Sequence, residues 1–153
     1  MTSLAFDVLS HLQGRTLATA ESCTGGGIGN ALTAVPGASN VYKGGVISYC
    51  NEIKQGLLNV PQNTLAEFGA VSAPVAEAMA QGARTALNAD VAVSVTGLAG
   101  PSGDEFGNPV GTVFIGYADE KKVISRHFLF SGDRDAIRWK TIEAALQLIL
   151  ENA

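Results

Sequence analysis

The sequence is poor in cysteine and histidine and has no long run of apolar residues. Its two cysteines, Cys23 and Cys50, match no metal-ligand spacing. No apolar run approaches the ~20 residues needed to cross a bilayer, and the first residues lack the basic and apolar blocks of a secretory signal. These absences predict a cytoplasmic protein with no membrane association, in which both cysteines stay reduced.

An excess of positive charge is also missing. Ten basic residues stand against fourteen acidic ones, which gives a net charge of −4, and no basic stripe occurs. Nucleic acid is therefore disfavoured as a partner, because binding it requires a basic surface that neutralises phosphates. The chain does contain 46% hydrophobic residues over 153 positions, so we expect a single domain over residues 1–153 with one core.

Strand and helix patterns alternate along the chain. Short apolar segments predict five strands, at residues 16–19, 46–49, 91–95, 110–117 and 123–130, the last two forming a hairpin. Helical spacing of apolar residues predicts helices around residues 4–12, 28–35, 51–58, 61–68 and 72–87, and a last helix capped by Ser131 or Asp133. This order predicts an α/β fold of three layers, α/β/α, with a mixed, mostly parallel sheet of about five strands.

Three loops follow predicted strands, at residues 21–27, 49–54 and 96–108. They contain nearly all the polar residues that are poorly suited to a core. In folds of this class, ligands bind beyond the carboxyl ends of the strands. We therefore expect the functional site where these loops meet.

Ser22 lies between a predicted strand and a Gly-rich helix start. A hydroxyl exposed there would adjoin free backbone N–H groups, which favour a phosphate or a developing oxyanion. The alternative is that Ser22 or Thr24 only caps the helix, and the segment alone does not separate the two. Gly25 to Gly27 match neither a Walker loop nor the GxGxxG fingerprint.

A serine needs a base to become a nucleophile. His11 and His127 fall in a helix and a strand away from the three loops, which disfavours a Ser-His-Asp triad. Tyr49 and Lys54 remain, and a partly desolvated Lys54 would have a lowered pKa and accept the serine proton. The alternative for Lys54 is a solvated surface lysine.

Two other groups of charged residues have weaker interpretations. Asp104 and Glu105 are adjacent carboxylates with no histidine nearby, so we expect no metal site, and no cofactor is indicated. Arg134 and Arg138 lie at the start of the last helix, where either could meet a phosphate or remain on the surface.

Several motifs occur together and in a fixed order: AESCTGG (20–26), PG (36–37), GGVISYCNEIK (44–54), GAVS (69–72), VTGLAGP (95–101) and PVGTV (109–113). In this combination the chain resembles the CinA C-terminal domain family from about residue 16 to the last helix. The resemblance implies an amidohydrolase that converts nicotinamide mononucleotide (NMN) to nicotinate mononucleotide and ammonia.

The resemblance further implies that Ser22 is the nucleophile and that Lys54 and Tyr49 form its base system. It also implies a homo-oligomer, with a dimer as the expected form. A non-catalytic nucleotide-binding or regulatory domain is the alternative, and loss of Ser22 or Lys54 would favour it. This chain keeps both residues.

Substrate binding is expected from two Gly-rich turns and one cation. Amides near the first turn, or of Thr96 and Gly97, are candidates for the oxyanion hole, and Arg138 is the candidate for the phosphate of NMN. The expected substrate-binding residues are Thr24, Gly25, Gly26, Thr96, Gly97, Gly100 and Arg138.

The chain departs from the family pattern at two places. Cys50 stands where the family usually has a small residue, often serine, and residues 102–105 replace a more Gly-rich stretch. The second departure lies in an expected substrate loop and so bears on substrate preference. Neither departure touches Ser22, Tyr49 or Lys54.

Overall fold

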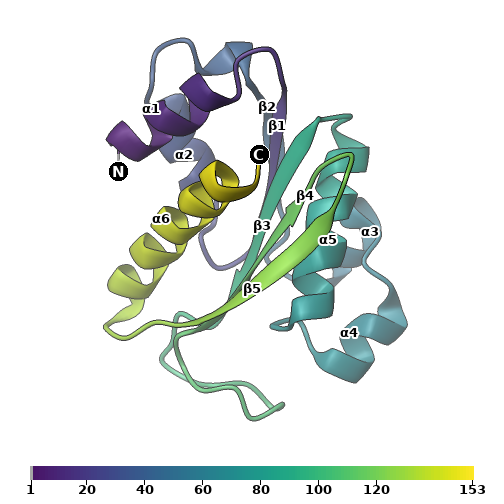
Figure 1. Ribbon diagram of the computed structural model, residues 1–153. Helices are drawn as coiled ribbons and strands as arrows, with labels where there is room; N and C mark the ends of the chain where they lie inside the picture. Colours follow the sequence, from purple (N-terminus) through teal and green to yellow (C-terminus); the bar gives the residue numbers. More distant parts are fainter. Residues whose placement is uncertain (1) are drawn as a thin grey trace.

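The computed structural model describes residues 2–153, which form one sheet with helices on both faces (Figure 1). The elements are, in chain order, α1 (Thr2–His11), β1 (Leu17–Glu21), α2 (Gly27–Thr33), the short 3-10 helix η1 (Ala38–Asn40), β2 (Tyr42–Ile47), α3 (Asn51–Leu58), α4 (Gln62–Phe68), α5 (Ala73–Ala86), β3 (Val91–Gly97), β4 (Thr112–Ala118), β5 (Val123–Leu129) and α6 (Arg134–Asn152).

The five strands lie in the order β2-β1-β3-β4-β5. Strand β1 pairs in parallel with both β2 and β3, whereas β4 is antiparallel to β3 and to β5. Four strands therefore point in one direction and only β4 opposes them. The predicted α/β fold with a mixed sheet of five strands is confirmed.

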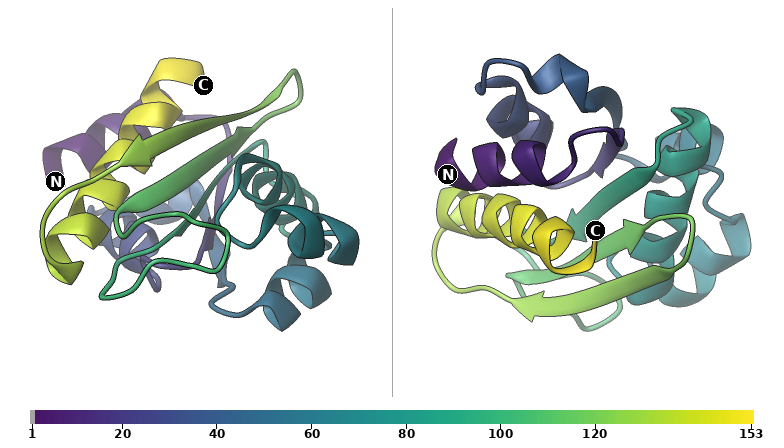
Figure 2. Two further views of the ribbon diagram at one scale, coloured as in Figure 1. Left: turned by 90° about the horizontal axis from the view of Figure 1, so that it is seen from below. Right: turned by 45° about the horizontal axis from the view of Figure 1, so that its top comes forward.

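Two groups of helices complete the layers. Helices α1, α2 and α6 pack together over one face, and α3, α4 and α5 cover the other, as the views in Figure 2 show. Each face has its own hydrophobic cluster. One is built around residues such as Leu12, Ile28 and Leu146, and the other around Leu58 and Met79. The central strands β1 and β3 are buried on both faces, which is why they read as continuous apolar runs in the sequence.

The second strand lies earlier in the chain than its sequence indicated. It runs over Tyr42–Ile47 and not over residues 46–49, so Ser48 and Tyr49 lie beyond its end. Two glycines at the centre hide the strand pattern. Gly45 is needed there, because a Cβ atom at this position would lie 2.1 Å from Oγ1 of Thr19 on β1.

Smaller differences affect the other strands and the last helix. Strands β1 and β3 each run two residues further than predicted, to Glu21 and Gly97, and β4 begins at Thr112. Of the two candidate caps for α6, Asp133 is the one observed, since its side chain accepts a hydrogen bond from the amide of Ala136. None of the helices within residues 2–153 combines the length and the apolar character that crossing a membrane requires.

The three parallel strands β1, β2 and β3 end at the same edge of the sheet. The segments that follow them are the turn after Glu21, the link from Ile47 to α3, and the loop that joins β3 to β4. The fold thus brings the three predicted loops together at one edge.

Candidate active site

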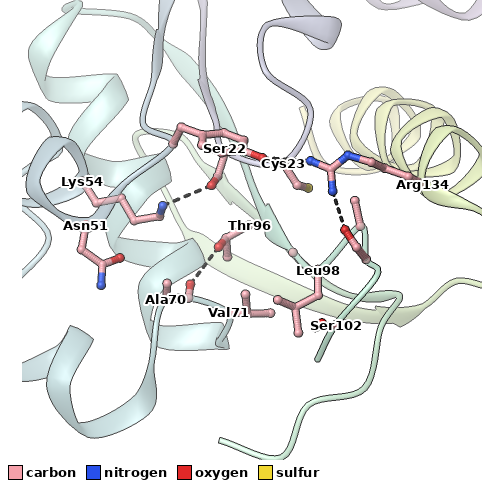
Figure 3. A pocket seen from close by; sticks show the side chains of 14 residues that line it. Ser22, Cys23, Asn51, Lys54, Ala70, Val71, Thr96, Leu98, Ser102 and Arg134 are labelled. Carbon is pink, nitrogen blue, oxygen red and sulfur yellow. Dashed lines mark hydrogen bonds between the residues drawn. The ribbon is translucent and has the colours of Figure 1, made fainter. Parts of the chain in front are cut away.

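A cleft of about 270 Å³ opens at this edge of the sheet. Its walls come from the ends of β1 and β3, the start of α3, the segment before α5, the loop after β3 and the start of α6 (Figure 3). The lining residues that carry a reactive or charged group are Ser22, Cys23, Tyr49, Lys54, Thr96, Ser102 and Arg134.

Ser22 is the first residue after β1. Its amide donates to the carbonyl of Val95 on β3, so the sheet continues as far as the serine. The chain then turns away, and the amide of Gly25 donates back to the carbonyl of Ser22. Gly25 and Gly26 both have positive φ, at 59° and 101°, which explains the glycines at this point. The turn leaves the Ser22 hydroxyl at the floor of the cleft, with the residue 8% exposed.

Lys54 points from the first turns of α3 toward this hydroxyl, as Figure 3 shows. Its Nζ atom lies 3.1 Å from Oγ of Ser22 and 2.7 Å from the carbonyl oxygen of Ser48, to which it donates. The residue is only 2% exposed, and burial lowers the pKa of its ammonium group below the ordinary value for lysine. Of the two alternatives for Lys54, the solvated surface lysine is therefore wrong, because the side chain is buried.

Cys23 lies next to Ser22 and also lines the cleft. Burial raises the pKa of its thiol to about 11, so the group is protonated at neutral pH. A protonated thiol is a weak nucleophile. Of the two adjacent side chains, the geometry and the ionisation both favour Ser22 as the reactive one.

The carboxylate of Glu21 occupies the start of α2. It is 2% exposed, and it accepts hydrogen bonds from the amides of Ile28 and Gly29 and from the hydroxyl of Thr24. These are the helix amides that the sequence suggested would be free for a bound anion. The protein supplies that anion itself, because a buried carboxylate satisfies the orphan amides and the positive end of the helix dipole.

The two candidate arginines have different surroundings. Arg134 lines the cleft, where its guanidinium donates to the carbonyl of Gly100 and, at 3.0 Å, to the hydroxyl of Tyr49. Arg138 does not line the cleft. Its guanidinium donates to the carbonyls of Cys23 and Thr24, both at 3.0 Å.

Tyr49 stands at the mouth of the cleft and is 61% exposed. Arg134 is its hydrogen-bond partner, and within residues 2–153 no hydrogen bond links it to Ser22 or Lys54. The geometry thus brings Tyr49 beside a cation at the rim of the cleft.

The loop after β3 forms the opposite wall. Thr96, Gly97 and Gly100 line the cleft as expected, and the Thr96 hydroxyl donates to the carbonyl of Ala70. By contrast, the expected residues Thr24, Gly25 and Gly26 are not among the lining residues. The Thr24 hydroxyl donates to Glu21, Gly25 lies beside Arg138, and Gly26 lies against Ile47.

Further along the same loop, Asp104 and Asn108 hold its shape. Asp104 accepts hydrogen bonds from the amides of Phe106 and Asn108, and the Asn108 side chain donates to Asp104 and to the carbonyl of Val71. A second hollow of about 550 Å³ continues from the cleft between this loop and α4. Asp104 is thus a structural residue of the loop, which accounts for one of the two adjacent carboxylates.

Both histidines lie away from the cleft, as the sequence indicated. His11 contacts the carbonyl of Ala153, and His127 stacks on the ring of Phe114. Across the described part of the chain, no three histidine, cysteine or carboxylate side chains are grouped closely enough to hold a metal ion.

Sequence reasoning missed the contacts that fix the reactive turn. It gave no role to Glu21 or to the carbonyl of Ser48, and it placed Arg138 with the substrate. The position of Glu21 offered a signal, because a carboxylate at the end of a buried strand must find partners. Arg138 offered none, since its partners are more than 110 residues away along the chain.

Comparison with known proteins identifies the family of the chain. The CinA C-terminal domain matches residues 2–153. The chain is 44% identical over 153 residues to the nicotinamide-nucleotide amidohydrolase PncC of Pseudomonas putida, and the match covers 99% of this chain and 96% of that protein. It is also 51% identical over 151 residues to a CinA-like protein of a Synechococcus strain, covering 96% of this chain but 36% of that protein. The chain therefore spans about a third of the length of such longer relatives.

Solved structures agree at the level of the whole fold. A competence damage-inducible protein A from Klebsiella pneumoniae has a TM-score of 0.96 at 35% identity, covering 99% of this chain and 95% of that one. A competence/damage inducible protein from Agrobacterium tumefaciens has a TM-score of 0.94 at 37% identity, covering 98% and 93%. The resemblance inferred from the motifs is confirmed, and the chain belongs to the CinA C-terminal domain family.

Proposed function

We propose that this protein hydrolyses the carboxamide of NMN to give nicotinate mononucleotide and ammonia. The observation that carries the proposal is the buried Lys54 amine 3.1 Å from the hydroxyl of Ser22 at the floor of a cleft. A relative with 44% identity along nearly its whole length is named a nicotinamide-nucleotide amidohydrolase, which supports this substrate class.

The reaction starts with the neutral form of Lys54. One N–H of the amine donates to the carbonyl of Ser48, which leaves the lone pair available to Ser22. Ser22 Oγ attacks the carboxamide carbon while its proton passes to Lys54 Nζ, and the carbonyl oxygen becomes an oxyanion. A lysine with a lowered pKa is suited to this step because it is more often neutral near neutral pH.

The remaining steps return the proton and regenerate the enzyme. The Lys54 ammonium gives its proton to the leaving nitrogen, and the carbon–nitrogen bond breaks. Ammonia departs, and the acyl group remains bound to Ser22 as an ester. A water molecule then attacks this ester, giving one proton to Lys54. That proton returns to Ser22 Oγ as the ester bond breaks and the carboxylic acid departs.

Two further groups are proposed to contact the substrate. Cys23 and Gly97 line the cleft together with Ser22, and their amides are candidate donors to the oxyanion. Arg134 is the candidate for the phosphate, because it is the guanidinium that lines the cleft, and Tyr49 is proposed to orient it. This assignment favours Arg134 over Arg138, which does not line the cleft and donates to the carbonyls of Cys23 and Thr24.

The proposal is tested by measuring ammonia release from NMN with the purified chain. Nicotinamide riboside, which lacks the phosphate, is the matched substrate control, and Ser22→Ala is the matched protein control. Ammonia release by the wild type that is lost in Ser22→Ala supports the proposal. Absence of release by a folded wild type overturns it, and the binding-domain alternative then requires saturable NMN binding without turnover.

A further inference from the structure

Arg138 contacts the turn after Ser22 from α6 and not from the cleft. It lies four residues after Arg134 on α6, yet it lines a separate hollow of about 340 Å³ between α2 and α6. Its Nε atom donates to the carbonyl of Cys23 and its terminal nitrogen to the carbonyl of Thr24, each at 3.0 Å. One planar guanidinium therefore holds two successive carbonyls of the turn that carries the nucleophile.

Fixing a carbonyl also fixes the direction of an N–H group. In a trans peptide the C=O and N–H bonds of one unit point in opposite directions. The carbonyl of Cys23 shares its peptide unit with the amide of Thr24, so Arg138 turns that amide away from α6. The carbonyl of Thr24 shares its peptide unit with the amide of Gly25, so Arg138 also fixes that amide. The Gly25 amide donates to the carbonyl of Ser22, and this carbonyl in turn sets the direction of the Cys23 amide.

These two amides remain available. Within residues 2–153, neither the N–H of Cys23 nor that of Thr24 donates a hydrogen bond to the protein. Cys23 and Thr24 are the first two residues after Ser22, and the amides of Gly25 and Gly27 in the same turn already donate to the protein. Two adjacent free donors beside a nucleophilic hydroxyl are suited to stabilise an oxyanion.

We propose that Arg138 is a positioning residue that aims the amides of Cys23 and Thr24 at the oxyanion formed when Ser22 attacks a carbonyl carbon. The inference rests on the proposed function, since the oxyanion forms only in that reaction. Arg138 acts through the backbone and does not touch the substrate. It is needed because the turn contains Gly25 and Gly26, which by themselves would let the backbone adopt other conformations.

The test compares Arg138→Ala and Arg138→Lys with the wild type. Removing one oxyanion donor costs roughly 10²–10³-fold in kcat, so loosening two donors without deleting them is expected to lower kcat roughly 10–100-fold. KM for NMN is expected to stay near the wild-type value, because no substrate contact is lost. Lysine keeps the charge but lacks the planar fork, so Arg138→Lys is expected to recover only part of the rate.

Chemical rescue separates positioning from general damage to the fold. In Arg138→Ala the hollow between α2 and α6 opens onto the vacated place, so methylguanidinium at millimolar concentration is expected to restore part of kcat. The matched control is Arg126→Met, which removes a guanidinium on β5 that pairs with Glu151 far from the cleft. Its kinetics are expected to be unchanged, with or without methylguanidinium.

A substrate-independent measurement distinguishes failure of this inference from failure of the proposed function. A fluorophosphonate probe labels an activated serine through a transition state whose phosphoryl oxygen uses the same donors. Slower labelling of Ser22 in both Arg138 variants supports the inference even if the wild type releases no ammonia from NMN. Unchanged kcat and labelling with a raised KM would make Arg138 a substrate contact and overturn the inference. One further outcome would overturn the inference. In it, Arg138→Lys folds normally but has a lowered kcat, and methylguanidinium restores no kcat to Arg138→Ala.

Discussion

The two walls of the cleft are built in opposite ways. On one side, Ser22 and Lys54 are buried, and the turn after Ser22 is tied to α2 through Glu21 and to α6 through Arg138. On the other side, the loop between β3 and β4 is held mainly by hydrogen bonds within itself, and it exposes side chains such as Phe106. The first wall is fixed by the core, whereas the second is fastened only at a few points.

The two walls are therefore suited to different tasks. Reacting groups must stay within a narrow range of distances, which a turn anchored in the core provides. A surface loop opens at lower free energy than core elements, so it can adapt to a substrate. We therefore expect changes in the Ser22 wall to lower kcat and changes in the loop wall to alter KM.

Removal of the nucleophile is the largest expected effect. Ser22→Ala is expected to lower kcat for NMN by at least ~10³-fold, because the covalent step is lost. Thermal unfolding followed by circular dichroism, alongside ammonia release, checks that the fold is retained. Activity near the wild-type level would mean that Ser22 is not the nucleophile.

Removal of the base is expected to come next. Lys54→Met should lower kcat ~10²–10⁴-fold, which is the usual contribution of a general base. In the wild type, kcat/KM should rise with pH through one ionisation below the ordinary pKa of lysine, because the neutral amine is the active form and burial lowers its pKa. A residual rate in Lys54→Met with the same pH profile would assign that ionisation to another group.

Arg134, which donates to Gly100 of the loop wall, gives a smaller effect, and this effect appears in KM. Arg134→Ala should raise KM for NMN roughly 10–100-fold, which corresponds to one charge-assisted hydrogen bond. The same substitution should leave kcat/KM for nicotinamide riboside nearly unchanged, since this substrate has no phosphate. Equal losses with both substrates would mean that Arg134 shapes the cleft and does not contact the phosphate.

The loop wall should give the smallest effect. Asn108→Ala removes two hydrogen bonds, one that ties the loop to the carbonyl of Val71 and one to Asp104 within the loop, at a cost of about 1–3 kcal/mol. We expect KM for NMN to rise severalfold and kcat to stay the same. Steady-state kinetics check this, and a fall in kcat with constant KM would show that the loop belongs to the reacting geometry.

Sequence patterns predicted the parts of the site that depend on local order along the chain. Alternation of strands and helices placed Ser22 and Lys54 at one edge of a sheet, and the motif order indicated the family. Patterns could not reveal which polar groups neutralise one another after folding. Arg138 reads as a cation near a helix start, and only its distance to the carbonyls of Cys23 and Thr24 shows that its donors are used.

The start of β2 shows the same limit for the fold. Glycines such as Gly45 lower the strand signal, and the reason for them lies on a neighbouring strand, at Thr19. The sequence shows the glycine but does not show that the Thr19 hydroxyl leaves no room for a side chain at this position. The predicted strand was therefore displaced toward the apolar residues Val46 and Ile47.

Several of the anchoring contacts end on main-chain oxygens. Lys54 is held by the carbonyl of Ser48, Arg134 by that of Gly100, Thr96 by that of Ala70, and Arg138 by two carbonyls of the Ser22 turn. A carbonyl is present whatever side chain its residue has. Substitutions should therefore have unequal effects at the two ends of these hydrogen bonds. Replacing a donor side chain removes the bond, whereas replacing the side chain at an acceptor position such as 48 or 70 keeps the carbonyl and so keeps the bond.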